Sequence, residues 1–198
     1  MFIQVMQGKC TQQDEMRALS EEWAEQSGPD AVGWLGGTYG FTDDGTFFGV
    51  IRFTDRDAAM ANSARPQTNA FAQRMAALFD GPVEFHDSDD VTLLFNGGSD
   101  EAGFVQIIRG KVDDPARLRA VMTSDPEALH AMRPDILGAT LALEPDGTFT
   151  ETVAFTDEES ARAGETSPPP PEIAAELDWA MTGASFHDLR NPWFESAR

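Results

Sequence analysis

The stretch Phe2-Ile-Gln-Val-Met-Gln-Gly-Lys9 returns 102 residues later as Phe104-Val-Gln-Ile-Ile-Arg-Gly-Lys111. The same shift places Asp44-Gly-Thr-Phe47 on Asp146-Gly-Thr-Phe149. A self-match at one fixed spacing is the signature of a duplicated structural unit. The sequence therefore predicts two copies of one fold in tandem.

The composition restricts the classes of partner. The chain of 198 residues carries a formal net charge of −20, which argues against nucleic acid and against anionic membrane surfaces. It contains no apolar run of about 18 residues, so we expect no transmembrane helix. The first residues lack the basic leader of a signal peptide. The single cysteine, Cys10, cannot form an internal disulfide, and we expect a cytoplasmic protein.

Hydrophobic periodicity predicts the order β-α-β-β-α-β in the first copy. A strand over 2–9 is followed by a helix capped by Thr11, with apolar side chains at helical spacing. A hairpin spans 31–53, and Asp55 caps a second helical region that Pro66 interrupts. A short strand over 83–87 completes the copy.

The second copy repeats this order, which gives an α+β fold of two ferredoxin-like repeats. Asp114-Pro115 opens its first helix, Pro126 divides that helix, and the prolines at 168–171 kink its second helical region. We predict a first repeat over 1–87, an acidic linker over 88–102 in which 91–95 could form a strand, and a second repeat over 103–198.

Two such repeats in tandem resemble the dimeric α/β barrels, in particular the antibiotic-biosynthesis-monooxygenase-like group. The resemblance implies an intrachain pseudo-dimeric barrel, with the sheets facing each other and the helices outside. It also implies an active site between sheet and helices or inside the barrel. Because two copies replace the usual dimer, we expect a monomer or a weak homodimer. The superfamily includes cofactor-free oxygenases, haem proteins and non-catalytic barrels, so fold alone leaves the activity open.

Strand alternation divides the side chains between the two faces of each sheet. The consistently apolar positions are expected to face the helices: Ile3, Val5, Phe47, Ile51, Phe53, Val83 and Phe85, with Val105, Ile107, Phe149, Val153, Phe155, Ala184 and Phe186 in the second copy. The opposite set mixes apolar and polar groups, as the lining of a small-molecule cavity does. It comprises Phe2, Gln4, Met6, Trp34, Thr38, Phe48, Val50, Arg52, Glu84 and His86, with Phe104, Gln106, Ile108, Ile136, Thr140, Thr150, Thr152, Ser185 and His187 in the second copy.

Three members of the opposite set are catalytic candidates. His86 and His187 occupy matched positions, and each is either an acid or base or a strand residue held by a hydrogen bond. Arg52 has no counterpart arginine in the second copy, and it either binds an anionic ligand or pairs with Glu84.

Further members are candidates for substrate binding. Gln4 and Gln106 either bond a ligand or each other, and Trp34 either stacks on an aromatic substrate or belongs to the core. Thr38, Phe48, Glu84 and Thr140 complete the predicted lining.

Neither a metal nor a haem is expected. The sequence has no HExxH motif and no cysteine cluster that would bind a metal. Haem would require His130 to face inward from a helix beneath an open cavity, since the haem-degrading relatives use a helix histidine. We therefore expect a cofactor-independent protein.

Two functions remain open. The resemblance favours a cofactor-independent monooxygenase for a small aromatic or polyketide-like substrate, with His86 or His187 as base, Arg52 at the oxyanion and Trp34 stacked on the ring. The alternative is a non-catalytic barrel that binds a small molecule or serves in stress. We expect the functional pocket in the first copy, because a charged side chain kept inside a barrel suggests a task.

Overall fold

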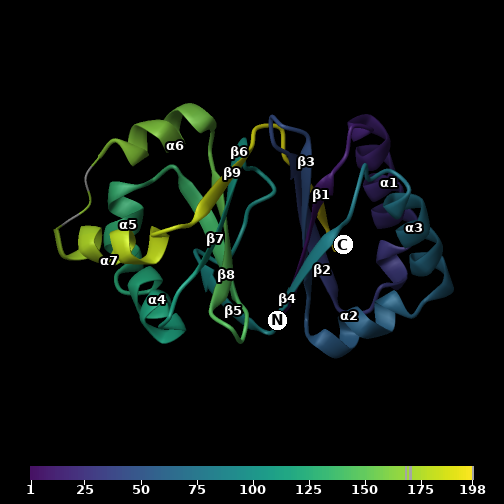
Figure 1. Ribbon diagram of the computed structural model, residues 1–198, viewed down its shortest axis with the longest axis horizontal. Helices are drawn as coiled ribbons and strands as arrows, with labels where there is room; N and C mark the ends of the chain where they lie inside the picture. Colours follow the sequence, from purple (N-terminus) through teal and green to yellow (C-terminus); the bar gives the residue numbers. More distant parts are fainter. Residues whose placement is uncertain (168, 170, 198) are drawn as a thin grey trace. The chain divides into compact units, whose positions relative to one another are not determined.

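The computed structural model describes residues 1–167, 169 and 171–197. Two compact units divide the chain: unit 1 is Met1–Asp89 together with the chain from Pro192 onward, and unit 2 is Asp90–Asn191. Each unit is a five-stranded antiparallel sheet with helices on one face (Figure 1). The predicted α+β fold of tandem ferredoxin-like repeats is confirmed. The predicted closure of the two sheets into one barrel stays a prediction, and so does the kink at 168–171, where residues 168 and 170 lie outside the described part.

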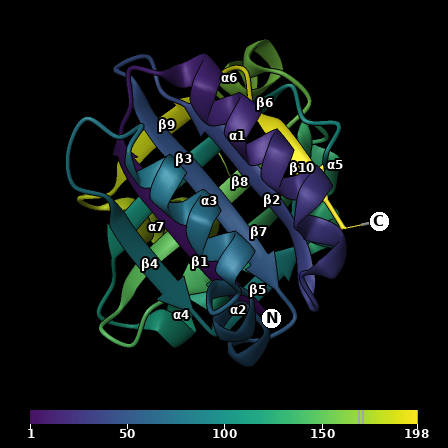
Figure 2. The same cartoon turned by 90° about the vertical axis from the view of Figure 1, so that its right-hand side faces the viewer.

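Unit 1 has the strand order β10-β2-β3-β1-β4. Its strands are β1 (Phe2–Lys9), β2 (Trp34–Phe41), β3 (Thr46–Phe53), β4 (Glu84–Ser88) and β10 (Trp193–Ser196). Its helices are α1 (Gln13–Gln26), the short 3-10 helix η1 (Gly28–Asp30), α2 (Arg56–Ser63) and α3 (Pro66–Ala76). Figure 2 shows α1 and α3 lying across the sheet, with β10 in yellow along α1.

Unit 2 has the matching order β5-β7-β8-β6-β9. Its strands are β5 (Asp90–Leu94), β6 (Phe104–Lys111), β7 (Ile136–Leu143), β8 (Thr148–Phe155) and β9 (Ser185–Leu189). Its helices are α4 (Pro115–Met122), α5 (Pro126–Met132), α6 (Glu158–Glu165) and α7 (Pro171–Met181).

Each repeat gives its last strand to the sheet of the other unit. β5 follows β4 directly in the chain, but it pairs with β7 of unit 2. β10 follows β9, but it pairs with β2 of unit 1. The segment 88–102, predicted as a linker with a strand near 91–95, therefore contributes an edge strand to unit 2.

Most of the predicted helix boundaries are confirmed. Asp55 and Asp114 cap α2 and α4 by accepting hydrogen bonds from the backbone N–H groups of Ala58 and Arg117. The prediction for Thr11 is wrong, because α1 has no side-chain cap. Thr11 instead donates its backbone N–H and its hydroxyl to the carboxylate of Asp80, at the far end of the second helical region.

The pairing register fixes which side chains share the helix-covered face. Side chains of directly paired residues point to the same face of a sheet. Phe2 pairs with Phe53 and Gln4 pairs with Ile51, so these four side chains share one face. The predicted helix-facing side chains of β3, β4, β8 and β9 are confirmed: Phe47, Ile51, Phe53, Phe85, Phe149, Val153, Phe155 and Phe186.

The prediction of which side chains face the helices is wrong for β1 and β6, where the alternation is shifted by one residue. Ile3 pairs with Arg52, on the face away from the helices, whereas Phe2 and Met6 pack among the helix-side clusters. Val5, Val105 and Ile107 share this error, and Gln4, Phe104, Gln106 and Ile108 lie beneath the helices. Both faces of β1 are apolar, so hydropathy alternation could not decide between them.

A bulge causes the same kind of error in β2 and β7. The register shifts between Trp34 and Gly36, and the equivalent shift in unit 2 follows Ile136. Because the shift reverses the alternation, Trp34 pairs with Phe53 and lies on the helix-covered face, while Thr38 lies on the opposite face.

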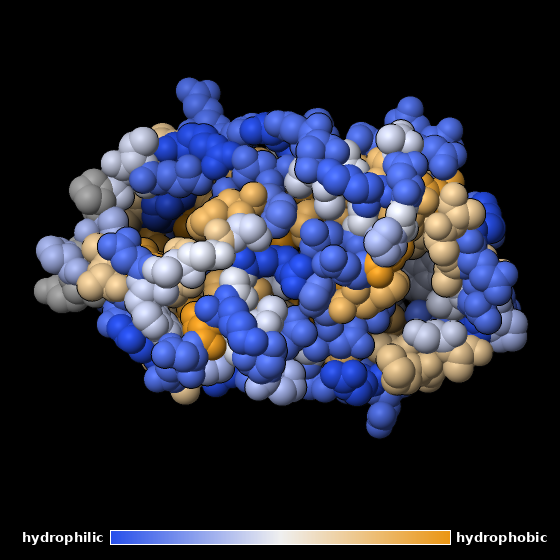
Figure 3. Space-filling view, viewed as in Figure 1, coloured by the Kyte–Doolittle hydropathy of each residue, from blue (hydrophilic) through white to orange (hydrophobic). Residues whose placement is uncertain are grey.

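The surface reflects the acidic composition. Hydrophilic side chains, blue in Figure 3, cover most of the visible face, as expected for a chain with a net charge of −20. None of the helices in the described part has the length and hydropathy that a bilayer crossing requires.

Candidate functional site

One row of side chains beneath the helices differs sharply between the two units. In unit 1 the row across the sheet runs Trp193, Tyr39, Gly49, Met6 and Phe85. In unit 2 the matching row runs Thr92, Leu141, Glu151, Ile108 and Phe186. Two aromatic rings and a glycine are thus replaced by two smaller side chains and a carboxylate.

Aromatic rings fill this layer in unit 1. Tyr39 stacks on Trp193 with ring centroids 5.7 Å apart, and the indole N–H of Trp193 donates to the Ser20 hydroxyl at 2.9 Å. A Cβ atom at Gly49 would lie 3.2 Å from the Phe47 ring and 3.3 Å from the Tyr39 ring. Unit 1 therefore has room for little more than glycine at this position. Burial raises the pKa of the Tyr39 hydroxyl, so it stays protonated.

Unit 2 places a carboxyl group in the same layer. Glu151 is 9% exposed, and its strand neighbours Ile108 and Leu141 are buried in the hydrophobic core of the unit. Among the residues that the structure describes, none forms a hydrogen bond or an ion pair with the Glu151 side chain. Loss of hydration raises its pKa to about 7. A carboxyl group with that pKa can take up and release a proton at neutral pH.

Arg119, which points to the same layer from α4, bonds the edge strand β5. Arg119 of α4 donates to the Thr92 hydroxyl at 3.2 Å and to the Asp90 carboxylate at 2.5 and 2.6 Å. Arg17, at the equivalent position of α1, lies 5.3 Å above the Trp193 ring. Each arginine thus holds the exchanged edge strand of its unit, and Arg119 leaves Glu151 uncompensated.

The sequence contains a signal for Glu151, although Glu151 is not among the predicted lining residues. Phe149, Val153 and Phe155 were assigned to the helix-covered face by alternation, and Glu151 falls on the same parity in the same strand. An acidic residue is rarely found at a buried position of an apolar strand face, because burying a carboxylate without a partner is costly. Its presence there therefore marks Glu151 as a candidate functional residue.

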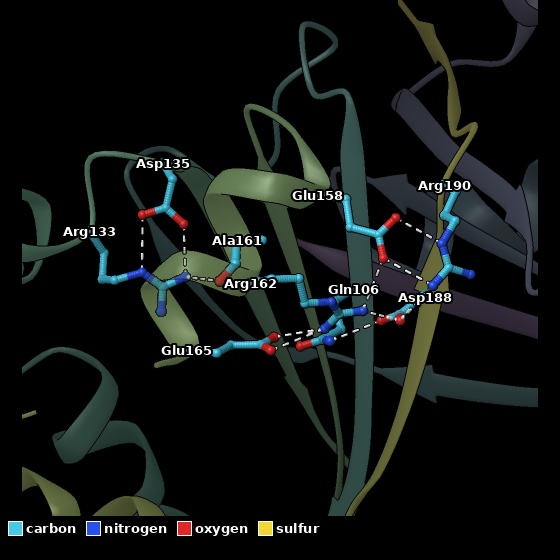
Figure 4. A network of polar contacts seen from close by, with 9 residues as sticks. All are labelled: Gln106, Arg133, Asp135, Glu158, Ala161, Arg162, Glu165, Asp188 and Arg190. Carbon is cyan, nitrogen blue, oxygen red and sulfur yellow. Dashed lines mark hydrogen bonds and ion pairs between the residues drawn. The ribbon is translucent and has the colours of Figure 1, made fainter. Parts of the chain in front are cut away.

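The two predicted glutamine ligands hold their own sheets together. Gln106 donates to Asp188 at 3.0 Å, and Arg162 pairs with Asp188 and Glu158 (Figure 4). The Arg162 guanidinium also lies 5.2 Å above the Phe104 ring. The cluster joins α6 to β6 and β9, and Arg190 extends it by binding Glu158.

Unit 1 builds the same cluster with an arginine from another helix position. Gln4 donates to Asp87 at 2.9 Å, and Arg56 lies 3.7 Å from Asp87 and 4.7 Å above the Phe2 ring. Since both amides bond a carboxylate of the neighbouring strand, Gln4 and Gln106 are placed as structural side chains.

The predicted pocket of the first copy is divided between two faces. Arg52, His86, Thr38, Phe48 and Glu84 share the face away from the helices. Trp34 lies on the other face, where it meets Trp23 edge to face at 5.0 Å. Its indole N–H is buried without a hydrogen-bond partner among the described residues. The prediction that Trp34 and Gln4 line one pocket with Arg52 is therefore wrong.

The register also argues against the predicted pair of Arg52 and Glu84. Arg52 lies level with Ser88, two strands away, and Glu84 is four residues further along β4. Strand spacing and rise put the two Cα atoms about 16 Å apart, which is too far for a direct ion pair. Arg52 donates to the Thr38 hydroxyl at 3.1 Å, and Glu84 lies 3.7 Å from the His86 ring.

In the second copy, His187 and Thr140 also lie on the face away from the helices. The His187 ring is 3.0 Å from the Ser185 hydroxyl. His130 is exposed on α5 and meets the edge of the Phe95 ring at 5.3 Å, so it does not fit the inward-facing ligand that haem would need. The described residues contain no group of three or more histidine, cysteine or acidic side chains placed to hold a metal ion.

Comparison with known proteins relates the chain to solved structures. No family model and no curated protein matches the sequence. A "putative monooxygenase" from Lactobacillus acidophilus NCFM is similar in structure, with a TM-score of 0.76 and 13% identity, over 100% of this chain and 97% of the other. An "anthrone oxidase-like protein" has a TM-score of 0.69 and 10% identity, over 99% and 93% of the two chains.

A "putative monooxygenase" from Fusobacterium nucleatum subsp. nucleatum has a TM-score of 0.68 and 10% identity, over 98% of this chain and 94% of the other. Matches that span nearly the whole of both chains cover both repeats together. The chain thus has the fold of these monooxygenase-like proteins, with both ferredoxin-like units in one polypeptide.

Proposed function

We propose that the chain binds a small, flat aromatic molecule beneath the helices of unit 2 and oxidises it with molecular oxygen, with Glu151 accepting the first proton. The proposal rests on one observation: Glu151 is a buried carboxyl group without a partner among the described residues, between the apolar side chains of Ile108 and Leu141. A buried, unpaired carboxylate lowers stability, and such groups are concentrated at functional sites.

The pKa of Glu151 suits a general base. With a pKa of about 7, a large fraction of the carboxyl groups is ionised at neutral pH, and the ionised form is more basic than an ordinary glutamate. A flat aromatic ketone with an acidic CH2 group matches the apolar side chains on either side of Glu151 and gives it a proton to remove.

The reaction balances with oxygen as the only co-substrate. Glu151 takes a proton from the CH2 group, and the resulting carbanion passes its electrons to O2, which forms a new C–O bond. Loss of the second C–H proton and cleavage of the O–O bond leave a C=O group, and the other oxygen atom departs as water. The CH2 group is oxidised, O2 is reduced, and Glu151 returns its proton to the departing water.

The similar fold of an "anthrone oxidase-like protein" supports the choice of test substrate. Purified protein is mixed with anthrone, and oxygen uptake and quinone absorbance are followed. We expect turnover with the wild-type protein and a loss of at least a hundredfold in Glu151→Gln, because the amide cannot accept the proton. Glu127→Gln, an exposed change on α5, serves as the control with unchanged turnover. Equal rates in Glu151→Gln and wild type would exclude Glu151 as the base.

A further inference from the structure

Unit 2 carries a hollow at the end of its sheet that is separate from Glu151. Its volume is about 600 Å³, and it is open to solvent. The end of β6, the start of α4, the β7–β8 hairpin and the end of α7 form its walls: Lys111, Val112, Asp113, Pro115, Pro145, Asp146, Gly147, Trp179 and Thr182. None of the predicted catalytic or substrate-binding residues lines it.

In unit 1 the chain that follows α3 is hydrogen-bonded to the end of β1. Asp80 accepts hydrogen bonds from the backbone and the hydroxyl of Thr11, at 2.7 and 3.1 Å, and its own N–H donates to the Lys9 carbonyl at 2.8 Å. The duplication places Thr182 at the Asp80 position and Asp113 at the Thr11 position. Thr182 turns back to donate to the Asp178 carbonyl, at 2.6 Å, so it does not form this tie.

The duplication also brings an indole to the hollow. Trp179 stands where unit 1 has Ala77. Arg117 lies 4.1 Å above the Trp179 ring and is itself held by both carboxylate oxygens of Glu176, at 2.7 and 3.0 Å. Trp179 lines the hollow, whereas Arg117 does not. A packed, half-buried indole beside two proline rings offers flat walls for an aromatic ligand.

The charges of the lining favour a cation. Lys111 is neutralised by Asp146 at 2.6 Å, and hydrogen bonds from Lys111 and Thr148 hold the pKa of the Asp146 carboxyl well below its usual range. Asp113 is exposed, and within the described residues it accepts no hydrogen bond and forms no ion pair, although its charge acts on the Arg117 guanidinium nearby. The hollow therefore presents a carboxylate without a bonded partner, in a chain whose net charge of −20 attracts cations.

We propose that this hollow is a binding site for a flat aromatic cation, which stacks on Trp179 and places its positive charge beside Asp113. An aromatic face and an adjacent carboxylate form the usual pair of groups that recognise such a ligand. The site is independent of the proposed oxidation at Glu151, which involves another part of the unit.

The test uses 9-aminoacridine, a flat aromatic cation, in isothermal titration calorimetry at 150 mM salt, where weak attraction to the acidic surface is screened. Two other probes separate the contributions: 9-anthracenecarboxylate is flat but anionic, and spermidine is cationic but not aromatic. We expect saturable binding of one 9-aminoacridine per chain, and much weaker binding of the other two. Equal binding of the anion, or equal binding of spermidine, would overturn the proposal.

Three variants test the residues. Trp179→Ala should weaken 9-aminoacridine binding at least tenfold, and Asp113→Asn, which keeps the shape of the side chain, about fivefold. Asp14→Asn, an exposed change on α1, is the matched control and should bind like wild type. Trp179→Phe retains a ring in case the alanine variant folds poorly, and it should bind between wild type and Trp179→Ala. Wild-type affinity in folded Asp113→Asn and Trp179→Ala would refute the site.

Discussion

Glu151 of unit 2 occupies the position that Gly49 occupies in unit 1. Gly49 pairs with Met6 and Tyr39, and Glu151 pairs with the matching residues Ile108 and Leu141. The same sheet position is therefore filled by aromatic neighbours in one copy and by an ionisable side chain in the other. This difference makes unit 2 the half of the molecule in which we propose the catalytic site.

Glu151 should make the stability of the protein depend on pH. Its folded-state pKa of about 7 lies above the ordinary value of 4.5, so the folded protein binds more protons between these two pH values. The free energy of unfolding should therefore fall as pH rises through this window, by roughly 3 kcal/mol in total. Glu151→Gln should lack this fall and be the more stable protein at pH 8. Urea unfolding of both proteins from pH 4 to 8 measures it, and parallel pH profiles would contradict it.

Two substitutions distinguish which of the two copies carries the catalytic site. Arg52→Met keeps most of the packing but removes the charge and the hydrogen bond to Thr38. The sequence predicts the functional pocket around Arg52, whereas the proposed base is Glu151. We expect anthrone oxidation to persist in Arg52→Met and to disappear in Glu151→Gln. The reverse result would return the site to the first copy.

The exchanged strand β10 should be essential to unit 1. Trp193 is 5% exposed, stacks on Tyr39 and donates to Ser20. Trp193→Ala should lower the free energy of unfolding by about 3–5 kcal/mol, the usual cost of removing a buried tryptophan. Thr92→Ala, at the matching position in unit 2, should cost only about 1 kcal/mol because one hydrogen bond is lost. Urea unfolding measures both variants, and a loss in Trp193→Ala no larger than the expected loss in Thr92→Ala would contradict the importance of β10.

Gly138 should tolerate no side chain. A Cβ atom there would lie 1.5 Å from the Gly97 carbonyl oxygen, in the chain that leads away from β5. Gly138→Ala therefore requires a backbone shift, and we expect a loss of roughly 1–3 kcal/mol or more. Gly81→Ala is the control, since an added Cβ there meets no atom within 4 Å. Thermal unfolding compares them, and equal melting temperatures would contradict the close approach.

The sequence was sufficient for the duplication and the element order, because identical residues and strong turn signals recur at one spacing. It was insufficient for the faces of β1, where Phe2 and Met6 are as apolar as Ile3 and Val5. Gln4 was placed away from the helices because it is polar, yet its amide is satisfied by Asp87. The bulge after Trp34 reverses the alternation; a glycine follows it in each copy, Gly36 and Gly138, and this signal was not used.

The exchange of edge strands between the two units could not be predicted from the sequence either. β5 was recognised as a strand near 91–95, but local patterns do not say which sheet a strand joins. That choice depends on long-range contacts such as the Arg119 bonds to Asp90 and Thr92. Glu151, by contrast, could have been found, because its strand alternates regularly through Phe149 and Val153.

The most direct test of Glu151 is its own titration. The protein is labelled with ¹³C at the glutamate side-chain carboxyl carbons, and their chemical shifts are followed by NMR from pH 3 to 9. The signal missing in Glu151→Gln identifies the residue. We predict one glutamate with a pKa of about 7, absent from the variant spectrum. A Glu151 signal that titrates at or below the ordinary 4.5 would contradict the account, because the carboxyl group would then be solvated or paired.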